Sequence, residues 1–311
     1  MLITTQKPYK ISVLLLTYNH EKYIQQALDA LFYQLITETI ELVIADDASS
    51  DSTVEIIKEY EGKDDRFCFK YLNNTKNMGV TKNYQRGFKA CSGKYVAVLE
   101  GDDYWISPYK LQRQMDFLDN HWECSLCSVN YFIFEEDHCN FYPRSRIGDK
   151  HRLISARDLI MDNLVGNFST CMYRKSALDY LPIRLFEIES YDWIVNICIA
   201  QTSMIGFLEQ PMSVYRLHSK GVWSKTSALQ KLRKQQELII DYDILTNHVF
   251  QMEFELLSNQ LKQRIFITKL KKQPVIGILL NLIDILSSKL IKTVRVLIPS
   301  KLKFFILNNT P

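Results

Sequence analysis

The stretch GKYVAVLEGDDYW, residues 93–105, places three carboxylates directly after an apolar run. The run from Tyr95 to Leu99 has the length and the β-branched content of a buried strand. Glu100, Asp102 and Asp103 follow it at once. Negative charge at the end of a core strand is typical of a sheet whose strand ends carry a ligand site.

Three earlier apolar runs resemble this strand, and segments with helical periodicity separate them. The runs are ISVLLL at 11–16, IELVIA at 40–45 and FCFKYL at 67–72. Strands and helices that alternate in this way predict an α/β fold, with a mostly parallel central sheet and helices on both faces.

Two helix starts are predicted from capping side chains. Ser52 and Glu55 have capping-box spacing, and Ser107 before Pro108 fits an N-cap and a first helical residue. The second half is expected to add two strands, at 167–174 and 211–223, and two helical segments, at 190–202 and 227–270.

Polar clusters follow three of the predicted strands. They are TYNHE, DDASSD and EGDD. One polar strand end could be an ordinary loop or a helix cap. Because the carboxyl ends of parallel strands meet at one edge of a sheet, three of them together predict a shared binding site.

Glu100 and Asp102 are candidate ligands of a hard cation. Two carboxylates one residue apart can hold Mg²⁺ or Mn²⁺, which keeps positions open for phosphate oxygens. The alternative is a purely structural role, as a solvated acidic turn before the next helix, and this role suits Asp103. A carboxylate of DDASSD could accept a hydrogen bond from a pyrimidine N3–H. The sequence lacks both GxGxxG and GxxxxGK[ST], so a dinucleotide site and a P-loop are without support.

These segments together resemble the family 2 glycosyltransferases, which have the GT-A fold, a Rossmann-like sheet. The resemblance covers roughly 70% of the chain, from about residue 10 to residue 224. Its segments stand in the family's order: SVLLLTYNHEKYIQQALDAL, ELVIADDASSDSTVEII, NMGVTKNYQRGF, GKYVAVLEGDDYWISPYKLQRQMDFL, YDWIVN and YRLHSKGVWS. It implies a nucleotide-diphosphate sugar donor, a divalent cation (Mn²⁺ or Mg²⁺) and an acceptor hydroxyl.

The resemblance also assigns roles to single residues. Asp102 and His218 are expected at the metal, with Glu100 as an uncertain ligand because it stands where the family usually has Asp. Asp192, in YDW, is expected to be the general base that takes the acceptor proton in an inverting transfer. The structural alternative for Asp192 is to stabilise a helix N-terminus with its negative charge. The remaining positions are expected to bind the nucleotide sugar: Thr17, Tyr18, Asn19, Glu21, Asp46, Asp47, Gly79, Lys82, Gly101 and Arg216.

Charge divides the 311-residue chain into two parts. Residues 1–224 carry a net charge of −5 and residues 225–311 a net charge of +8. We expect a catalytic domain at 1–224 and a helical, basic extension at 225–311. Apolar residues from Ile276 to Val294 recur at helical spacing, which suits either an anionic membrane surface or packing on the domain, or a homodimer contact.

The expected location is the cytoplasm, either free or peripherally bound to the inner face of the plasma membrane, because no signal-peptide pattern accompanies the seven cysteines. The overall expectation is a glycosyltransferase that uses a UDP- or dTDP-sugar and a glycan or lipid-linked glycan acceptor in bacterial surface-polysaccharide assembly. Nucleic acid is not an expected partner. The alternatives are an inactive nucleotide-sugar-binding scaffold and a nucleotidyltransferase.

Overall fold

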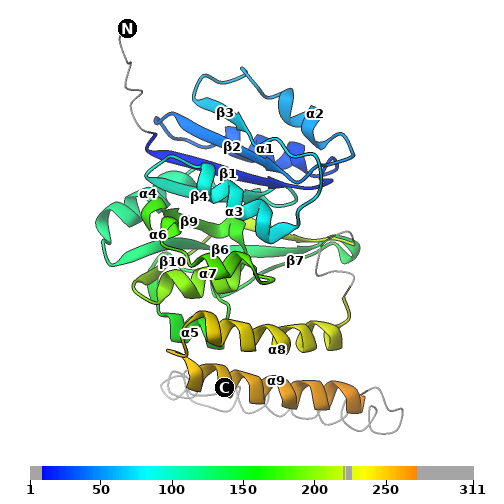
Figure 1. The fold of residues 1–311 in the computed structure, drawn as a ribbon. Coiled ribbons are helices and arrows are strands. Elements are labelled where there is room, and N and C mark those ends of the chain that lie inside the picture. Colours follow the sequence, from blue (N-terminus) through cyan, green and yellow to red (C-terminus); the bar gives the residue numbers. More distant parts are fainter. Residues whose placement is uncertain (1–8, 220, 222–225, 272–311) are drawn as a thin grey trace, which may run out of the picture. The chain divides into compact units, whose positions relative to one another are not determined.

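A computed structural model describes residues 9–219, 221 and 226–271 (Figure 1). The apolar positions between Ile276 and Val294, and Trp223, lie outside the described residues. Within that part of the chain, ten strands form one sheet in the order β3-β2-β1-β4-β9-β6-β10-β5, with β7 paired to β6 and β8 to β10. The strands are β1 Ile11–Thr17, β2 Ile40–Asp46, β3 Phe67–Tyr71, β4 Tyr95–Glu100, β5 Tyr104–Trp105, β6 Cys124–Glu135, β7 Asn140–Pro143, β8 His151–Ile154, β9 Cys171–Arg174 and β10 Met204–Leu217.

The front of the sheet is parallel, as the apolar runs predict. β1 pairs in parallel with β2 and β4, and β2 with β3. The short strand β9 is antiparallel to both β4 and β6 and joins this front to the long parallel pair of β6 and β10. The predicted fold class is therefore confirmed.

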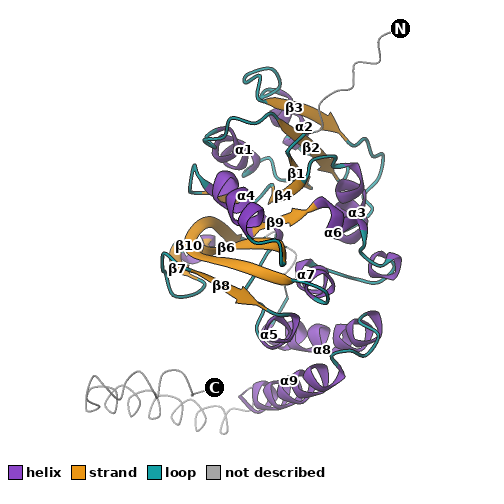
Figure 2. Ribbon diagram, turned by 90° about the vertical axis from the view of Figure 1, so that its left-hand side faces the viewer, coloured by secondary structure: helices purple, strands orange, loops and turns teal. Residues whose placement is uncertain are grey.

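Helices cover both faces of the sheet (Figure 2). On one face α1 and α4 pack on alternate residues of β1, including Ile11, Val13 and Leu15. On the other face α3 approaches β1 so closely that a Cβ at Gly87 would lie 2.4 Å from the Leu14 side chain. The helices are α1 Ile24–Phe32, α2 Thr53–Lys58, α3 Val80–Ala90, α4 Lys110–Asn120, α5 Ala156–Met161, α6 Lys175–Asp179, α7 Asp192–Ala200, α8 Ala228–Leu245 and α9 Gln251–Lys271.

Both predicted side-chain caps are wrong. Ser52 makes no capping side-chain bond, and Asp51 instead accepts the N–H of Thr53 at 3.1 Å. α4 begins at Lys110, not at Pro108, because the carbonyl of Pro108 accepts the Leu35 N–H at 2.8 Å and holds that residue outside the helix. Ser52 is still the N-cap residue of α2, so the predicted start of that helix is confirmed, whereas a tertiary hydrogen bond at Pro108 delays the start of α4.

The segment predicted as a strand at 167–174 is only half a strand. The 3-10 helix η2, Phe168–Thr170, precedes β9. It forms because the carbonyl of Asn167 accepts the N–H of Thr170 at 3.3 Å and its hydroxyl at 2.8 Å. Two further 3-10 helices are η1, Glu136–His138, and η3, Ile183–Phe186.

The chain divides into two compact units. The first comprises residues up to Thr226 together with Leu238–Leu257, and the second comprises Ser227–Glu237 and the chain from Ser258 on. Parts of α8 and α9 thus belong to the first unit, where Tyr242 packs its ring against Trp193. No helix among the described residues is both long and apolar enough to cross a membrane.

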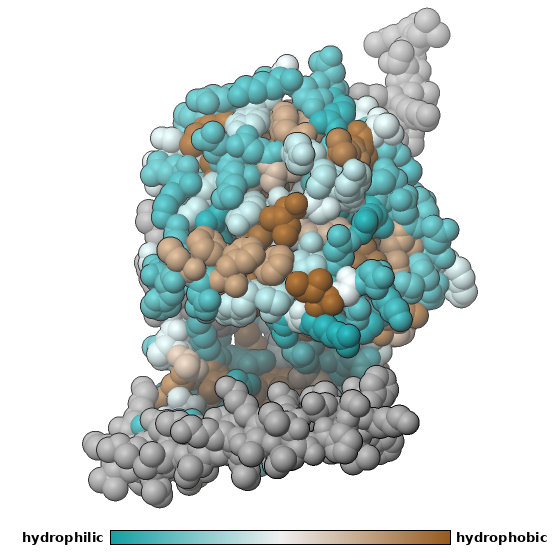
Figure 3. All heavy atoms as spheres, turned by 180° about the vertical axis from the view of Figure 1, so that it is seen from behind, coloured by the Kyte–Doolittle hydropathy of each residue, from teal (hydrophilic) through white to brown (hydrophobic). Residues whose placement is uncertain are grey.

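The described surface in Figure 3 is mainly hydrophilic, with hydrophobic side chains in small separate groups. Such scattered groups are normal for a folded domain. All seven cysteines are free thiols, and Cys124 and Cys127 are buried in the core.

Candidate active site

The polar strand ends meet at one edge of the sheet, as expected. In the register of the sheet Thr17 pairs with Asp46, and Leu16 pairs with Glu100. The Thr17 hydroxyl donates to Asp46 Oδ1 at 2.8 Å. Strand pairing therefore brings the loops after β1, β2 and β4 together.

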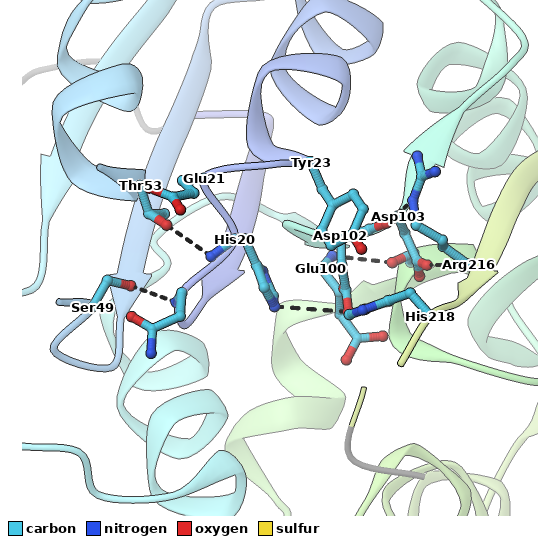
Figure 4. A network of polar contacts seen from close by, with 12 residues as sticks. His20, Glu21, Tyr23, Ser49, Thr53, Glu100, Asp102, Asp103, Arg216 and His218 are labelled. Carbon is cyan, nitrogen blue, oxygen red and sulfur yellow. Dashed lines mark hydrogen bonds and ion pairs between the residues drawn. The ribbon is translucent and has the colours of Figure 1, made fainter. Parts of the chain in front are cut away.

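The loops after β1 and β2 bind each other through reciprocal hydrogen bonds (Figure 4). The N–H of Asn19 donates to the Ser49 hydroxyl, and the N–H of Ser50 donates to Asn19 Oδ1, both at 2.8 Å. The N–H of Ser52 donates to Glu21 at 3.2 Å. Asn19 and Glu21 therefore hold the two loops together, whatever ligand they meet. Tyr18 is 45% exposed.

Asp47 holds a third loop. Its Oδ1 accepts from Asn74 Nδ2 at 2.9 Å and from the Met78 N–H at 2.8 Å, and its Oδ2 accepts from the Gly79 N–H at 2.9 Å. The side chain is 3% exposed. Gly79 has φ +84, a backbone conformation that glycine adopts without strain, and α3 begins after it. Asp47, which is expected from the sequence to bind the nucleotide sugar, thus fixes the turn before α3.

Lys82 and Arg86 project from α3 with different surroundings. Lys82 is exposed, and its Nζ lies 3.5 Å from Gln85. Arg86 donates to the carbonyls of Asp46 and Leu72, which ties β2 to the loop that ends in Gly79. The sequence analysis did not single out Arg86.

The carboxylates after β4 have very different environments. Burial and the neighbouring charges of Asp103, Asp102 and Asp192 raise the pKa of Glu100 well above its usual value. Burial and the charge of Asp102 do the same for the pKa of Asp103. Gly101 lies between them in close quarters, since a Cβ there would lie 2.8 Å from both His20 Nδ1 and Thr17 Cγ2.

Asp102 is the member of this group that stays ionised. Burial acts to raise its pKa, but the charges of His20 and His218 and a hydrogen bond from His218 bring the pKa below its usual value. His218 Nε2 lies 3.0 Å and His20 Nε2 3.7 Å from Asp102 Oδ2. Figure 4 shows the two imidazoles pointing at this carboxylate from opposite sides. The Nδ1 atoms of both rings are buried and have no hydrogen-bond partner in the described part of the chain.

Arg216 hydrogen-bonds both to the backbone of Asp102 and to the side chain of Asp103, and so holds this turn in place. Arg216 Nε donates to the Asp102 carbonyl at 2.9 Å, and the Arg216 N–H donates to Asp103 Oδ1 at 2.9 Å. The guanidinium lies over the rings of Tyr23 and Tyr104. A second guanidinium nitrogen, Nη2, donates to Gln26 Oε1, so two of the guanidinium nitrogens bond to the protein itself. Asp103 does more than end a turn, because it bonds the turn after β4 to the backbone of β10.

Asp192 lies at the first position of α7 and lines a cavity that two of the carboxylates after β4 also line. The cavity, of about 100 Å³, is lined by Glu100, Asp102, Asp192 and Arg216, together with Val80, Asn167, Phe168, Tyr191, Tyr215 and Gly221. Burial raises the pKa of Asp192 to about 7, while a hydrogen bond from Asn163 and backbone N–H groups act to lower it. Asn163 Nδ2 donates to Asp192 Oδ1 at 3.3 Å.

The site suits a cation for which the protein supplies only some of the ligands. Asp102 and His218 offer one carboxylate and one imidazole. Burial, together with neighbouring negative charge, raises the pKa of Glu100 and of Asp103, and a bound cation would favour their ionised forms. Across residues 9–219, 221 and 226–271, no three His, Cys, Asp or Glu side chains form a metal-binding group. Mg²⁺-type sites that use one or two carboxylates and complete the coordination with substrate phosphates need no larger set.

Sequence reasoning missed three side chains of this site. His20, Asn163 and Asn167 approach Asp102, Asp192 and the cavity respectively. His20 stands inside TYNHE, so its place after β1 could have marked it. Asn163 and Asn167 belong to a segment without periodicity, and only the tertiary structure brings them to the site.

A family model described as Glycosyl transferase family 2 matches residues 12–181. The uncharacterized protein Rv1520 of Mycobacterium tuberculosis is 34% identical over 216 residues, which cover 68% of this chain and 60% of that protein. The chain therefore spans about three fifths of that relative's length. The putative teichuronic acid biosynthesis glycosyltransferase TuaG of Bacillus subtilis is 30% identical over 135 residues, 43% of this chain and 51% of TuaG.

Two solved structures share the fold. TarS of S. aureus, residues 1–349 with UDP-GlcNAc, has a TM-score of 0.60 at 20% identity and covers 83% of this chain and 72% of that one. The mannosyltransferase PcManGT of Pyrobaculum calidifontis, with GDP-Man and Mn²⁺, has a TM-score of 0.58 at 15% identity and covers 91% of this chain and 81% of that one.

Proposed function

Since the chain belongs to the family 2 glycosyltransferases, we propose that it transfers a sugar from a UDP- or dTDP-sugar to an acceptor hydroxyl with inversion. One observation carries the proposal. Asp192 and the group after β4 that contains Asp102 line a single cavity. A base and a diphosphate-binding group on one cavity are what a direct displacement at a sugar carbon requires.

Asp192 is the proposed general base. Its pKa of about 7 means that it is partly ionised at neutral pH and binds a proton readily. Asn163 donates to one carboxylate oxygen and so orients the group, which leaves the other oxygen for the acceptor hydroxyl. An attack on the anomeric carbon from this side inverts its configuration without a covalent intermediate.

The nucleotide is proposed to bind along the loops after β1, β2 and β3. Residues proposed to bind it or to hold these loops in place are Thr17, Tyr18, Asn19, Glu21, Asp46, Asp47, Gly79 and Lys82, with Gly101 beside them. Asp47 uses three hydrogen bonds on the loop between β3 and α3, and a carboxylate has about four lone-pair sites, so one remains for a pyrimidine N–H.

Asp102 and His218 are the proposed protein ligands of Mn²⁺ or Mg²⁺, with Glu100 beside them. Such an ion neutralises negative charge on the departing diphosphate. Arg216 keeps Asp102 in place through its carbonyl. His20 adds positive charge near the same oxygen when it is protonated.

The proposal is tested by incubating the protein with Mn²⁺ and a panel of nucleotide sugars and by measuring nucleotide release. Wild type is expected to release UDP or dTDP from at least one donor, and Asp192→Asn to release far less. Tight UDP binding without release or transfer from any donor would favour an inactive scaffold. Full transfer by Asp192→Asn would refute the assignment of the base.

The basic part of the chain supports a second, separate proposal about location. The described residues of the second unit carry Lys231, Arg233, Lys234, Lys262, Arg264, Lys269 and Lys271 against one acid, Glu237. Basic segments of this kind bind anionic lipid headgroups. A membrane-bound acceptor would place the enzyme there, in surface-polysaccharide assembly. Vesicles with anionic lipid should co-sediment the full chain, and neutral vesicles should not.

A further inference from the structure

Asn167 is a buried amide whose side chain has no partner among the residues that the structure describes. It is 6% exposed, and neither Oδ1 nor Nδ2 makes a hydrogen bond to any of them. Unpaired polar atoms in the interior cost free energy, and most buried polar groups in proteins are bonded. Asn167 lines the cavity that Asp192 and Glu100 also line. It therefore offers one donor and one acceptor where a substrate would lie.

The side chain does not serve the local backbone. Asn167 precedes η2, but its carbonyl, not its amide side chain, accepts from Thr170 and from the Cys171 thiol. A residue at this position commonly caps a helix with its side chain. Here that function is already filled, so the amide is free for another one.

The turn that carries Asn167 is held from several sides. The Ser169 hydroxyl accepts the Glu100 N–H at 3.0 Å, and Trp105 Nε1 donates to the Ser169 carbonyl at 2.8 Å. Gln114 donates to the Thr170 carbonyl at 2.9 Å, while Lys110 donates to Gln114 at 2.8 Å. Because these hydrogen bonds hold the backbone of the turn in place, the Asn167 amide is pre-organised for a ligand.

We infer that Asn167 is a specificity-determining residue that binds a hydroxyl group of a sugar in the cavity, as donor and acceptor at once. A hydroxyl is itself both a donor and an acceptor, so a single ligand group can satisfy both amide atoms. The sugar is either the transferred sugar or the acceptor sugar, because the cavity reaches both Asp102 and Asp192. This inference rests on the proposed function.

A stability measurement tests the inference without any substrate. Asn167→Leu keeps the approximate size of the side chain and removes both unpaired atoms. Replacing an unpaired buried polar group by an apolar one is neutral or stabilising. The thermal midpoint of Asn167→Leu is thus expected to equal or exceed that of wild type.

Asn130 supplies the matched control. It is fully buried, and its amide donates to the Glu209 carbonyl at 3.1 Å and accepts the Tyr131 N–H at 2.9 Å. Asn130→Leu should therefore lower the thermal midpoint. A fall for Asn167→Leu as large as that for Asn130→Leu would overturn the inference, because it would mean that Asn167 serves the fold.

Binding and kinetics then identify the sugar. The probes are UDP, UDP-glucose and UDP-N-acetylglucosamine with Mn²⁺, and p-nitrophenyl glycosides as acceptors. If Asn167 binds the transferred sugar, Asn167→Leu weakens the binding of the UDP-sugar about tenfold and leaves that of UDP unchanged. If it binds the acceptor, donor binding is unchanged and KM for the glycoside rises.

Two negative results have different meanings. Unchanged donor binding together with unchanged acceptor kinetics in Asn167→Leu would refute the inference and leave the proposed function standing. If wild type neither bound nor turned over any donor of the full panel of UDP- and dTDP-sugars, the proposed function would fail, and the inference with it.

Discussion

His218 Nε2 lies 3.0 Å from Oδ2 of Asp102, although 116 residues separate them in the chain. Asp102 follows β4 and His218 follows β10, and β9 and β6 lie between these two strands in the sheet, so only the folded chain brings the two side chains together. The contact joins an anionic oxygen and an imidazole nitrogen, the two donor types that a divalent transition-metal ion accepts.

Removal of the His218 imidazole is expected to weaken the use of metal. His218→Ala should raise the Mn²⁺ concentration needed for half-maximal nucleotide release by at least about tenfold. Titration of nucleotide release against Mn²⁺ measures this. His248→Ala is the matched control, since His248 is an exposed histidine paired with Asp243 at 2.7 Å. Equal Mn²⁺ dependence in wild type and His218→Ala would contradict the assignment.

Activity should depend on the ionisation of Asp192. Only the carboxylate can accept a proton, and the pKa of Asp192 is raised to about 7 by burial. The value of kcat/KM is therefore expected to rise with pH and to level off above about pH 7. Asp192→Asn should lose roughly 10²–10⁴-fold in kcat and the pH dependence as well. A flat profile for wild type through this range would argue against Asp192 as the base.

The same carboxyl should make stability depend on pH. A carboxyl whose pKa is raised in the folded state binds more protons there than in the unfolded chain, so its charge destabilises the fold progressively as pH rises toward about 7. Asp192→Asn removes that charge. In EDTA, the thermal midpoint of Asp192→Asn should exceed that of wild type more at pH 8 than at pH 4. The same difference at both values would contradict the raised pKa.

Asp103 should matter through its hydrogen bond to Arg216 more than through its charge. Burial and the neighbouring Asp102 raise the pKa of Asp103, which favours its neutral form. Asp103→Asn can still accept the Arg216 N–H, so we expect little change in the free energy of unfolding in urea. Asp103→Ala leaves that buried N–H without a partner and should cost about 1–3 kcal/mol. Equal loss in both variants would mean that the charge itself is needed.

The loop before α3 should loosen when Asp47 is changed. The carboxylate accepts the N–H groups of Met78 and Gly79 with different oxygens. Asp47→Asn turns one of those acceptors into a donor, so hydrogen exchange of residues 74–79 is expected to become faster. Lys82→Ala, on an exposed side chain of the same region, is the control. Unchanged exchange in Asp47→Asn would show that other contacts hold the loop.

The front of the fold could be predicted from sequence because its information is local. Apolar runs of strand length alternate with helical periodicity, and this order allows few arrangements other than a parallel sheet with its polar ends at one edge. The helix start at Ser52 was predicted correctly, but Asp51 and not Ser52 accepts the Thr53 N–H. The start at Ser107 was predicted wrongly, because the Pro108 carbonyl bonds to Leu35 and α4 begins only at Lys110.

The candidate site was predictable only where a residue directly follows a strand or begins a helix. Asp46, Glu100 and Asp102 stand at strand ends, and Asp192 at a helix start. Asn163 and Asn167 lie in an irregular turn, where no spacing indicates which way a side chain points. Their place at the cavity becomes visible only once the turn is folded against β4.

The sequence by itself determined the sheet, its layers and the edge at which the polar loops gather, because strand and helix periodicities are set by neighbours in the chain. Only the tertiary structure decided how the carboxylates differ. Asp102 lies beside two histidines, Asp103 beneath the Arg216 backbone, and Asp192 in a buried pocket. Burial and distant charges fix these pKa values, and both depend on contacts between residues far apart in the chain.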